Sequence, residues 1–240
     1  MSDALAGQVA IVTGAGRGIG RAIAMAFAAE GAVVTLVSRT RADLASVAGD
    51  IRDAGGRALA IPADVTQDSA VEAVVEQAAA ELGRIDILVT AAGVASFGLL
   101  TATKPGDWDA MLSVNLRAAM VCCRAVLPTM QRQRRGTILN LSSIATKRVI
   151  PGCAAYAATK AGVAAFTAVL AEELRADGVR VGLLVPGAVD TPLWDTIPAG
   201  PDRSLMLRPE DVARAAVLMV SLPPGASLEE LTILPAGGIL

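Results

Sequence analysis

Residues 9–20 read VAIVTGAGRGIG, and this stretch decides the fold that the sequence predicts. A short β-branched run ends in a glycine-rich turn, and an Ala-rich segment with helical periodicity follows. Glycines let the backbone turn sharply and approach a ligand, while the N–H groups that begin a helix favour a phosphate. The spacing is T-G-x-x-x-G-x-G rather than G-x-G-x-x-G, but its place between a first strand and a first helix suits a dinucleotide. A purely structural turn is the alternative. The residues predicted to hold the dinucleotide here are Gly14, Gly16, Arg17, Gly18, Ile19 and Gly20.

The alternation of short apolar runs with helical segments continues along the whole chain. Strands are predicted at 8–13, 32–38, 57–61, 85–90, 136–142, 179–185 and 231–234. Helices are predicted at 18–30, 41–54, 67–82, 107–134, 155–176 and 209–221. This order predicts one doubly wound, Rossmann-like α/β domain over residues 1–240, with a mainly parallel seven-stranded sheet and helices on both faces. A stretch of about 188–208 has little regular pattern and is rich in proline and glycine, so we expect a substrate lid there.

Composition argues against several classes of partner. The chain has 240 residues, of which 53% are hydrophobic and 2% aromatic, so small aliphatic side chains must build a large core. A net charge of −2 without a long basic block disfavours a nucleic-acid partner. We also expect no membrane span and no signal peptide, because long uninterrupted apolar runs and a basic leader are missing. The chain has no histidine, and Cys122, Cys123 and Cys153 lack metal-ligand spacing. We therefore expect no metal site and a cytoplasmic protein with reduced thiols.

The end of the second predicted strand indicates which dinucleotide is bound. NAD-binding domains place an acid there to bind the ribose 2′-hydroxyl, whereas this chain reads Val37-Ser38-Arg39. A guanidinium pairs with a 2′-phosphate, and Arg17 could add a second positive charge beside the hydroxyl of Ser38. These residues favour NADP(H) over NAD, with solvated surface arginines as the alternative reading. Asp64 and Val65, after the third strand, are candidates for the adenine contact, although Asp is also a common turn residue.

Four polar residues are candidates for the chemistry. Tyr156 and Lys160 lie four residues apart in a predicted helix and so share one face, where an ammonium would lower the pKa of a phenol from about 10. Ser143 ends the fifth strand, where its hydroxyl could bond a substrate carbonyl, and Ser142 competes for that place. Asn115 lies inside a predicted helix that it does not favour, and it could hold a water bonded to Lys160 or simply bend the helix.

The order and spacing of these motifs resemble the short-chain dehydrogenase/reductase family over nearly the whole chain. The segments that carry the resemblance are TGAGRGIG at 13–20, DV at 64–65, AAG at 91–93, VNL at 114–116, LSS at 141–143, YAATK at 156–160 and PGAVDT at 186–191. The resemblance implies Asn115, Ser143, Tyr156 and Lys160 as the catalytic set, with Tyr156 as acid/base and Lys160 on the nicotinamide ribose. It further implies a homotetramer, with a homodimer as the alternative, paired through the helices at about 107–134 and 155–176. The cofactor contacts that it implies are Arg17 and Arg39 on the 2′-phosphate, Ala92 and Gly93, and Pro186, Gly187, Val189 and Thr191 beside the nicotinamide.

Two segments depart from the family pattern. The family usually has Asn-Asn-Ala-Gly after the fourth strand, whereas this chain has Thr90-Ala91-Ala92-Gly93. We expect the backbone contacts of Ala92 and Gly93 to remain, the side-chain bracing to be lost and the cofactor affinity to fall. The C-terminal segment 229–238 keeps only half of the common ending, and 208–235 looks more like the branch that oxidises short hydroxy acids.

The residues expected beside Tyr156 are mainly apolar, which predicts a small, largely apolar carbonyl or secondary alcohol as substrate. Arg148 or Arg203 could clamp a substrate carboxylate. A 3-oxoacyl thioester on an acidic carrier is an alternative, with the basic run at 132–135 as its docking site. A non-catalytic dinucleotide sensor is the alternative from another class, and a sugar-nucleotide epimerase fits poorly because little chain follows the last strand. The candidate substrate-side residues are Val94, Ala95, Ser96, Val149, Ile150, Cys153, Val189, Leu193 and Trp194.

Overall fold

The structure, a computed structural model, describes residues 3–197, 200 and 202–238. The strands are β1 Val9–Thr13, β2 Val33–Ser38, β3 Arg57–Pro62, β4 Ile87–Thr90, β5 Gly136–Leu141, β6 Val179–Pro186 and β7 Glu230–Ile233. The α-helices are α1 Gly18–Ala29, α2 Arg41–Asp53, α3 Asp68–Leu82, α4 Pro105–Met111, α5 Ala118–Gln133, α6 Ala154–Leu174 and α7 Pro209–Val220. The predicted strands and helices are therefore present, most with ends shifted by one or two residues.

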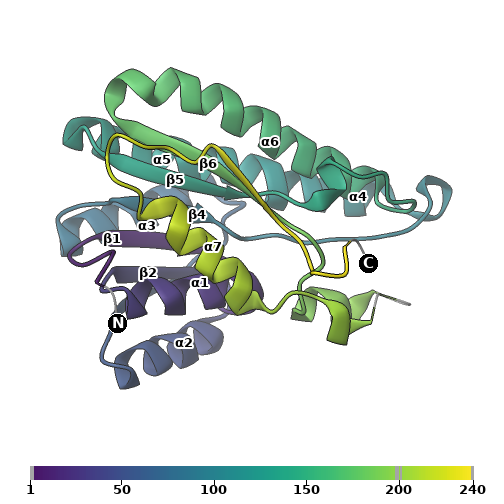
Figure 1. The fold of residues 1–240 in the computed structure, drawn as a ribbon, viewed down its shortest axis with the longest axis horizontal. Coiled ribbons are helices and arrows are strands. Elements are labelled where there is room, and N and C mark those ends of the chain that lie inside the picture. The colour runs from purple at the N-terminus through teal and green to yellow at the C-terminus, as the bar shows by residue number, and fades with distance from the viewer. Residues whose placement is uncertain (1–2, 198–199, 201, 239–240) are drawn as a thin grey trace.

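The seven strands form one sheet in the order β3-β2-β1-β4-β5-β6-β7, and all six pairings are parallel (Figure 1). β1 and β4 are neighbours at the centre of the sheet. The chain runs outward from β1 to β2 and β3 on one side, and from β4 to β5, β6 and β7 on the other, so the strand order reverses between β1 and β4. Parallel strands place all their carboxyl ends at one edge, and the gap at such a reversal is where doubly wound sheets bind ligands. The predicted Rossmann-like α/β class is confirmed.

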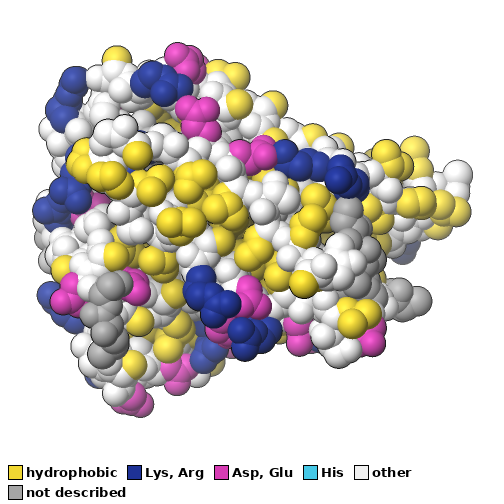
Figure 2. Space-filling view, in the orientation of Figure 1, with side chains coloured by type: hydrophobic (Ala, Val, Ile, Leu, Met, Phe, Trp, Pro, Cys, Tyr) yellow, Lys and Arg dark blue, Asp and Glu magenta, His cyan; other side chains and the backbone are white. Residues whose placement is uncertain are grey.

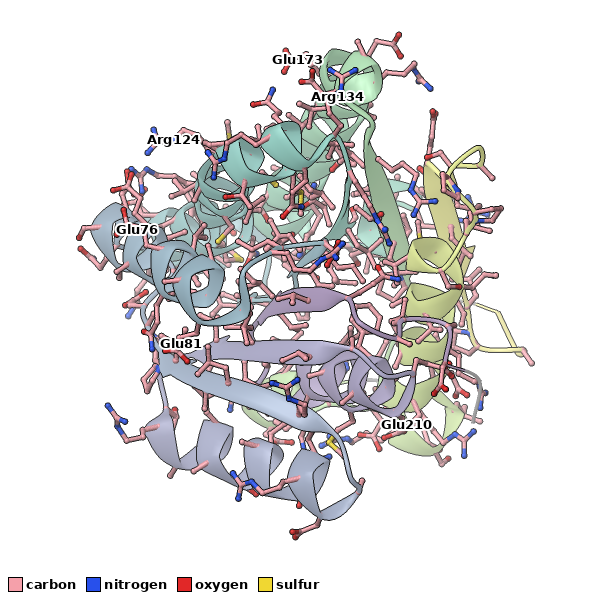
Figure 3. All side chains as sticks on the ribbon, turned by 90° about the vertical axis from the view of Figure 1, so that its left-hand side faces the viewer. Glu76, Glu81, Arg124, Arg134, Glu173 and Glu210 are labelled. Atoms are coloured by element: carbon pink, nitrogen blue, oxygen red, sulfur yellow. The ribbon has the colours of Figure 1, made fainter. Side chains whose placement is uncertain are left out.

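Alternation along the strands divides the apolar core between the two faces of the sheet. In β1, Ala10 and Val12 pack with α1, α2 and α7, whereas Ile11 packs with α3, α5 and α6. Successive strand side chains point to opposite faces, so both faces of a buried parallel strand must be apolar. The charged side chains labelled in Figure 3 are all exposed and belong to helices, except for Arg134, which directly follows α5.

The long helix predicted at 107–134 is interrupted. It begins as α4, passes through a π-helical segment at Leu112–Arg117, and continues as α5 with Pro128 inside it. A π-turn inserts an extra residue and changes which backbone groups are bonded, and such turns often mark functional sites. By length and hydropathy alone, Pro105–Gln133 and Ala154–Asp177 could each cross a membrane, a test that the packed helices of a protein core also pass.

The stretch predicted as a lid, 188–208, contains two short 3₁₀ helices, Pro192–Thr196 and Arg203–Leu205, and a bridge between Val189 and Leu207. Arg203 joins its two ends: it pairs with Asp190 at 2.5 Å and with Asp195 at 2.6 Å, and it donates to Thr191 O at 2.9 Å. Residues 198, 199 and 201 of the predicted lid lie outside the described residues.

Candidate active site

A cavity of about 550 Å³ opens at the carboxyl ends of β1, β2, β4, β5 and β6. All the sequence-predicted cofactor residues line it, together with Ser143, Tyr156 and Lys160. Asn115 is the exception, because it is buried behind the wall, beside Gly93. Of the residues expected on the substrate side, Ala95, Ser96 and Val149 are not part of the lining, and Val149 is 98% exposed.

The glycine-rich turn after β1 is closely fitted against its neighbours. Gly14 has a φ of 69°, and a Cβ there would lie 2.8 Å from Ala92 Cα. Gly18 has a φ of 55°, and its Cβ would meet Thr191 at 3.3 Å. A Cβ on Gly20 would lie only 2.3 Å from Gly14 O. These positions need glycine for conformation and for space, so the backbone itself forms a cradle against the start of α1.

The glycine turn and the end of β2 together present two cations and an unpartnered hydroxyl to the cavity. Arg17 and Arg39 are exposed, and neither forms a salt bridge with any described residue. Ser38 Oγ is buried without a hydrogen-bond partner in the described chain. A polar atom in that state is costly unless a ligand satisfies it, which fits a phosphate or a ribose hydroxyl.

Sequence reasoning missed one acid beside this pocket. Asp43, in the first turn of α2, lines the same cavity, and a Cβ on Gly16 would lie 3.0 Å from both Asp43 Cβ and Ser38 Oγ. Sequence analysis looked for an acid at the end of the second strand, and Asp43 lies a few residues later, in the first turn of the second helix.

Asp64, the acid that the sequence did single out, lies in the loop after β3. It accepts hydrogen bonds from Thr66 N and Oγ1, and these bonds together with the nearby Arg39 guanidinium hold the Asp64 pKa below its usual value.

The expected loss of side-chain bracing after β4 is not what the structure shows. Thr90 Oγ1 donates to Asn140 Oδ1 at 2.7 Å, and Asn140 Nδ2 donates to Thr167 Oγ1 at 2.9 Å. Thr13 Oγ1 accepts from Ala92 N at 3.3 Å. The threonine hydroxyls and the buried amide of Asn140 on β5 thus supply the side-chain bracing that the missing Asn pair would give. Asparagine is unusual inside a buried strand such as β5. The presence of Asn140 there is the sequence signal from which this hydrogen-bond network could have been predicted.

Tyr156 is in the first turn of α6 and borders the cavity. Burial of the hydroxyl raises the pKa of Tyr156 to about 12, and a hydrogen bond from the Ser143 side chain acts in the opposite direction. The sequence suggested that the Lys160 ammonium would lower this pKa. In the protein alone, desolvation outweighs any such effect, because Lys160 Nζ lies 5.9 Å from the centre of the phenol ring.

Lys160 is 6% exposed, and its ammonium donates to Leu141 O at 2.9 Å. Burial lowers its pKa to about 8, because the protonated form loses its hydration. An amine with this pKa can release and regain a proton near neutrality. The buried lysine is thus suited to proton transfer as well as to binding hydroxyl groups.

The two candidate serines have different surroundings. Ser142 is 3% exposed, and its hydroxyl donates to the backbone oxygen of Lys160, in the second turn of α6, at 3.2 Å. Ser143 Oγ accepts from Ala145 N at 3.2 Å and interacts with the Tyr156 hydroxyl. Ser142 therefore fixes the backbone of the helix, while the geometry favours Ser143 as the group beside the reacting phenol.

Asn115 lies in the π-helical segment and is 2% exposed. Its Oδ1 accepts from Val94 N at 2.8 Å, and its Nδ2 donates to Val94 O at 2.9 Å and to Thr159 Oγ1 at 3.2 Å. The side chain therefore ties the loop after β4 to helix α6, with both Nδ2 donors used by protein groups. The second lone pair of Oδ1 and the backbone are what remain for the water that the sequence suggested.

The segment after β6 forms the remaining wall with Pro186, Gly187, Val189 and Thr191. Arg203, which could have clamped a substrate carboxylate, is instead held by two aspartates and a carbonyl. A guanidinium that already binds two carboxylates and a carbonyl has few free N–H donors for a substrate carboxylate. Sequence analysis also missed Phe97, which lines the cavity beside Tyr156.

Comparisons with known proteins agree with this geometry. A family model described as "short chain dehydrogenase" matches residues 8–202. The chain is 42% identical to the short-chain reductase protein NovJ of Streptomyces niveus, over 96% of this chain and 93% of the relative. It is 36% identical to a 3-oxoacyl-[acyl-carrier-protein] reductase of Synechocystis sp., over 99% and 98% of the two chains.

Solved structures are similar over nearly the whole length. A metagenomic short-chain oxidoreductase in complex with NADP has a TM-score of 0.86 and 37% identity, covering 97% of this chain and 99% of the other. A 7α-hydroxysteroid dehydrogenase complexed with NADH and 7-oxo glycochenodeoxycholic acid has a TM-score of 0.91 and 28% identity, covering 98% and 95%. Nicotinamide dinucleotides of both kinds thus occur among the neighbours. The chain is an oxidoreductase that belongs to the short-chain dehydrogenase/reductase family.

Proposed function

We propose that the protein transfers a hydride between NADP(H) and a small, largely apolar ketone, aldehyde or secondary alcohol. The observation that carries the proposal is that a phenol, a hydroxyl and a buried amine, those of Tyr156, Ser143 and Lys160, meet in the cavity that the glycine turn also lines. A sensor that only binds a dinucleotide would need the glycine turn and not these three groups.

The residues have separate tasks in this reaction. The dinucleotide, when bound, supplies or accepts the hydride. Ser143 Oγ orients the substrate carbonyl, and Tyr156 donates a proton to the carbonyl oxygen as negative charge develops there. Lys160, with its pKa near 8, returns a proton toward the phenol and binds ribose hydroxyls. For alcohol oxidation the same groups act in reverse.

The preference for NADP(H) rests on charge. Arg17 and Arg39 lie beside the unpartnered Ser38 hydroxyl, and β2 ends without an acid. Asp43 opposes this preference, because its carboxylate lines the same region. Two guanidiniums without salt bridges outweigh one carboxylate for a dianionic 2′-phosphate, particularly because arginine can bind it in a bidentate manner.

A carbonyl screen that follows NADPH absorbance, repeated with NADH, tests the proposal. We expect turnover with NADPH to exceed that with NADH. In Tyr156→Phe, turnover should fall by about 10²- to 10⁴-fold while coenzyme binding remains, because only the proton donor is lost. Unchanged turnover in Tyr156→Phe would remove Tyr156 from the mechanism, and a better rate with NADH would refute the charge argument.

A 3-oxoacyl thioester is the second candidate substrate, favoured by the similarity to the Synechocystis reductase. The basic run at 132–135 gives it limited support, because Arg134 pairs with Asp177 at 3.7 Å and Arg135 with Asp86 at 3.8 Å. Reduction of acetoacetyl-coenzyme A, compared with a free ketone such as 2-butanone, discriminates the two. A strong preference for the thioester would establish the second candidate.

We further propose that the protein acts in the cytoplasm as a homotetramer, or failing that a homodimer. Leu112 in the π-helical segment, Met120 in α5 and Val169 in α6 are apolar and exposed by 46%, 43% and 59%, and burial of such side chains would suit pairing through the two long helices. The three cysteines are free and buried, as expected in a reducing compartment. Light scattering coupled to size-exclusion chromatography measures the assembly, and a monomer would refute it.

A further inference from the structure

The placement of aromatic side chains in this chain is uneven. The sequence has only two Trp, one Tyr and three Phe, and aliphatic side chains fill most of the core. Three of these aromatic residues, Phe97, Tyr156 and Trp194, line the candidate active-site cavity and contact one another in series. A chain that hardly uses aromatic rings to pack its core has therefore gathered half of them at the cavity.

The rings have defined relative orientations. Phe97 meets the Tyr156 ring edge to face, with centroids 5.5 Å apart and planes at 90°. The Trp194 ring lies 5.9 Å from Phe97 at 45°. Both distances lie within the range in which aromatic pairs attract each other beyond simple apolar burial. The three rings form a continuous aromatic wall that starts at the proton-donating phenol.

Backbone hydrogen bonds hold this wall in place. Trp194 Nε1 donates to Val189 O at 2.9 Å, so the indole N–H is satisfied and only apolar ring surface faces the cavity. The loop that carries Phe97 is attached to the loop before α6, because Gly98 N donates to Gly152 O at 2.9 Å. The ring positions are therefore fixed by groups outside the rings, as expected of a preformed binding surface.

Among the described residues, the rest of the substrate side adds apolar contact and no group suited to a charged ligand. Val94, Ile150 and Leu193 line it, and Arg203 is occupied by Asp190 and Asp195. A flat, uncharged ring can lie against the Phe97–Trp194 surface while a carbonyl next to it reaches Tyr156. A saturated ring of the same size would gain the apolar burial and lose the aromatic contribution.

We infer that this site selects aryl and arylmethyl ketones, here together called aryl ketones, and the matching benzylic or homobenzylic alcohols, with Phe97 and Trp194 as the specificity-determining residues. The inference rests on the proposed function and names its substrate class. In reduction, NADPH gives a hydride to the carbonyl carbon and Tyr156 gives a proton to the oxygen. The ketone becomes a secondary alcohol and NADPH becomes NADP⁺, and Tyr156 regains its proton from solvent through Lys160, so one proton is consumed in each reduction.

Matched pairs of ketones test the inference: acetophenone against cyclohexyl methyl ketone, and phenylacetone against cyclohexylacetone. The measurement is the ratio of kcat/KM for the aryl ketone to that for its saturated partner, in wild type and in variants. Intrinsic differences in ketone reactivity cancel when this ratio is compared between proteins. A general disturbance of Tyr156 lowers both members of a pair and leaves the ratio unchanged.

We expect the ratio to fall about threefold to tenfold in Phe97→Leu and in Trp194→Leu. Trp194→Phe keeps a ring and should retain most of the wild-type ratio. Phe166→Leu, which changes an α6 ring that packs against the core and does not line the cavity, is the matched control and should leave the ratio within about twofold.

Three outcomes decide the matter. A reduced ratio in both leucine variants, restored in Trp194→Phe, supports the inference. Equal ratios in wild type and both leucine variants, or a wild type that reduces aliphatic carbonyls and rejects every aryl ketone, overturn the inference and leave the proposed function standing. A wild type that binds NADPH and reduces no carbonyl overturns the proposed function, and the inference falls with it.

Discussion

Replacing Lys160 with methionine should change how the stability of the protein depends on pH. Methionine retains a long unbranched side chain and removes the buried ammonium. Burial lowers the Lys160 pKa to about 8 from a usual 10.5, so the unfolded chain binds the proton more tightly than the folded one. Stability must therefore rise with pH between these two values in the wild type, and this contribution must be lost in Lys160→Met.

The size of the effect follows from the pKa difference. Lys160 is only 6% exposed, so solvent screening is small. A shift of 10.5 to about 8 corresponds to a penalty of about 3 kcal/mol that is fully present below pH 8 and absent above pH 10.5. Between pH 7 and pH 9.5 the wild type should gain about 2 kcal/mol of unfolding free energy from this residue. The variant also loses the bond to Leu141 O, a cost that does not change with pH.

Urea unfolding at pH 7 and pH 9.5, at one protein concentration, measures this difference. The useful quantity is the pH-dependent change in wild type minus that in Lys160→Met, because other titrating groups cancel. Lys104→Met, at an exposed lysine, is the control and should behave like the wild type. Parallel pH dependence in wild type and Lys160→Met would show that the ammonium is not desolvated, and the argument for a labile proton at Lys160 would fail.

Four further substitutions test the coenzyme side of the cavity. Arg39→Ala should lower kcat/KM for NADPH about tenfold or more and leave that for NADH nearly unchanged, whereas Asp43→Asn should shift the ratio toward NADPH; equal effects on both coenzymes would contradict the charge argument. Gly14→Ala should cost about 1–3 kcal/mol in urea unfolding and weaken NADPH binding, seen by fluorescence titration, because its Cβ would lie 2.8 Å from Ala92 Cα at a φ of 69°. Thr90→Val should cost about 1–2 kcal/mol in the same unfolding assay, since it removes the 2.7 Å bond to Asn140, and an unchanged midpoint would show that the network does not brace the loop.

The fold could be predicted because local patterns carry it. Each strand of the sheet is a short apolar run bounded by turn residues, and each helix is an Ala-rich segment with a recognisable start, such as Pro209 with Glu210 and Asp211 in α7. The interruption at Leu112–Arg117 could not be predicted, because a π-turn leaves no periodic signature and depends on what Asn115 contacts in the loop after β4.

Parts of the candidate site depend on contacts between distant segments. The sequence identified the residues that line the cavity, since strand ends and helix starts gather at one edge of a parallel sheet. It did not show that Asn140 and Thr167 replace the missing Asn pair, because those residues come from β5 and α6. It also assigned Tyr156 a lowered pKa, whereas the sign depends on how deeply the hydroxyl is buried.

The backbone hydrogen bond from Gly98 N to Gly152 O links two surface loops that are far apart in the chain. The loop between β4 and α4 projects from the body in Figure 1, and apolar side chains gather at that end in Figure 2. Leu99 and Leu100, exposed by 66% and 59%, lie in this loop beyond the cavity lining. Because Gly98 and Gly152 share this hydrogen bond, a displacement of the loop at residues 98–104 would pass to the loop before α6, whose first turn carries Tyr156.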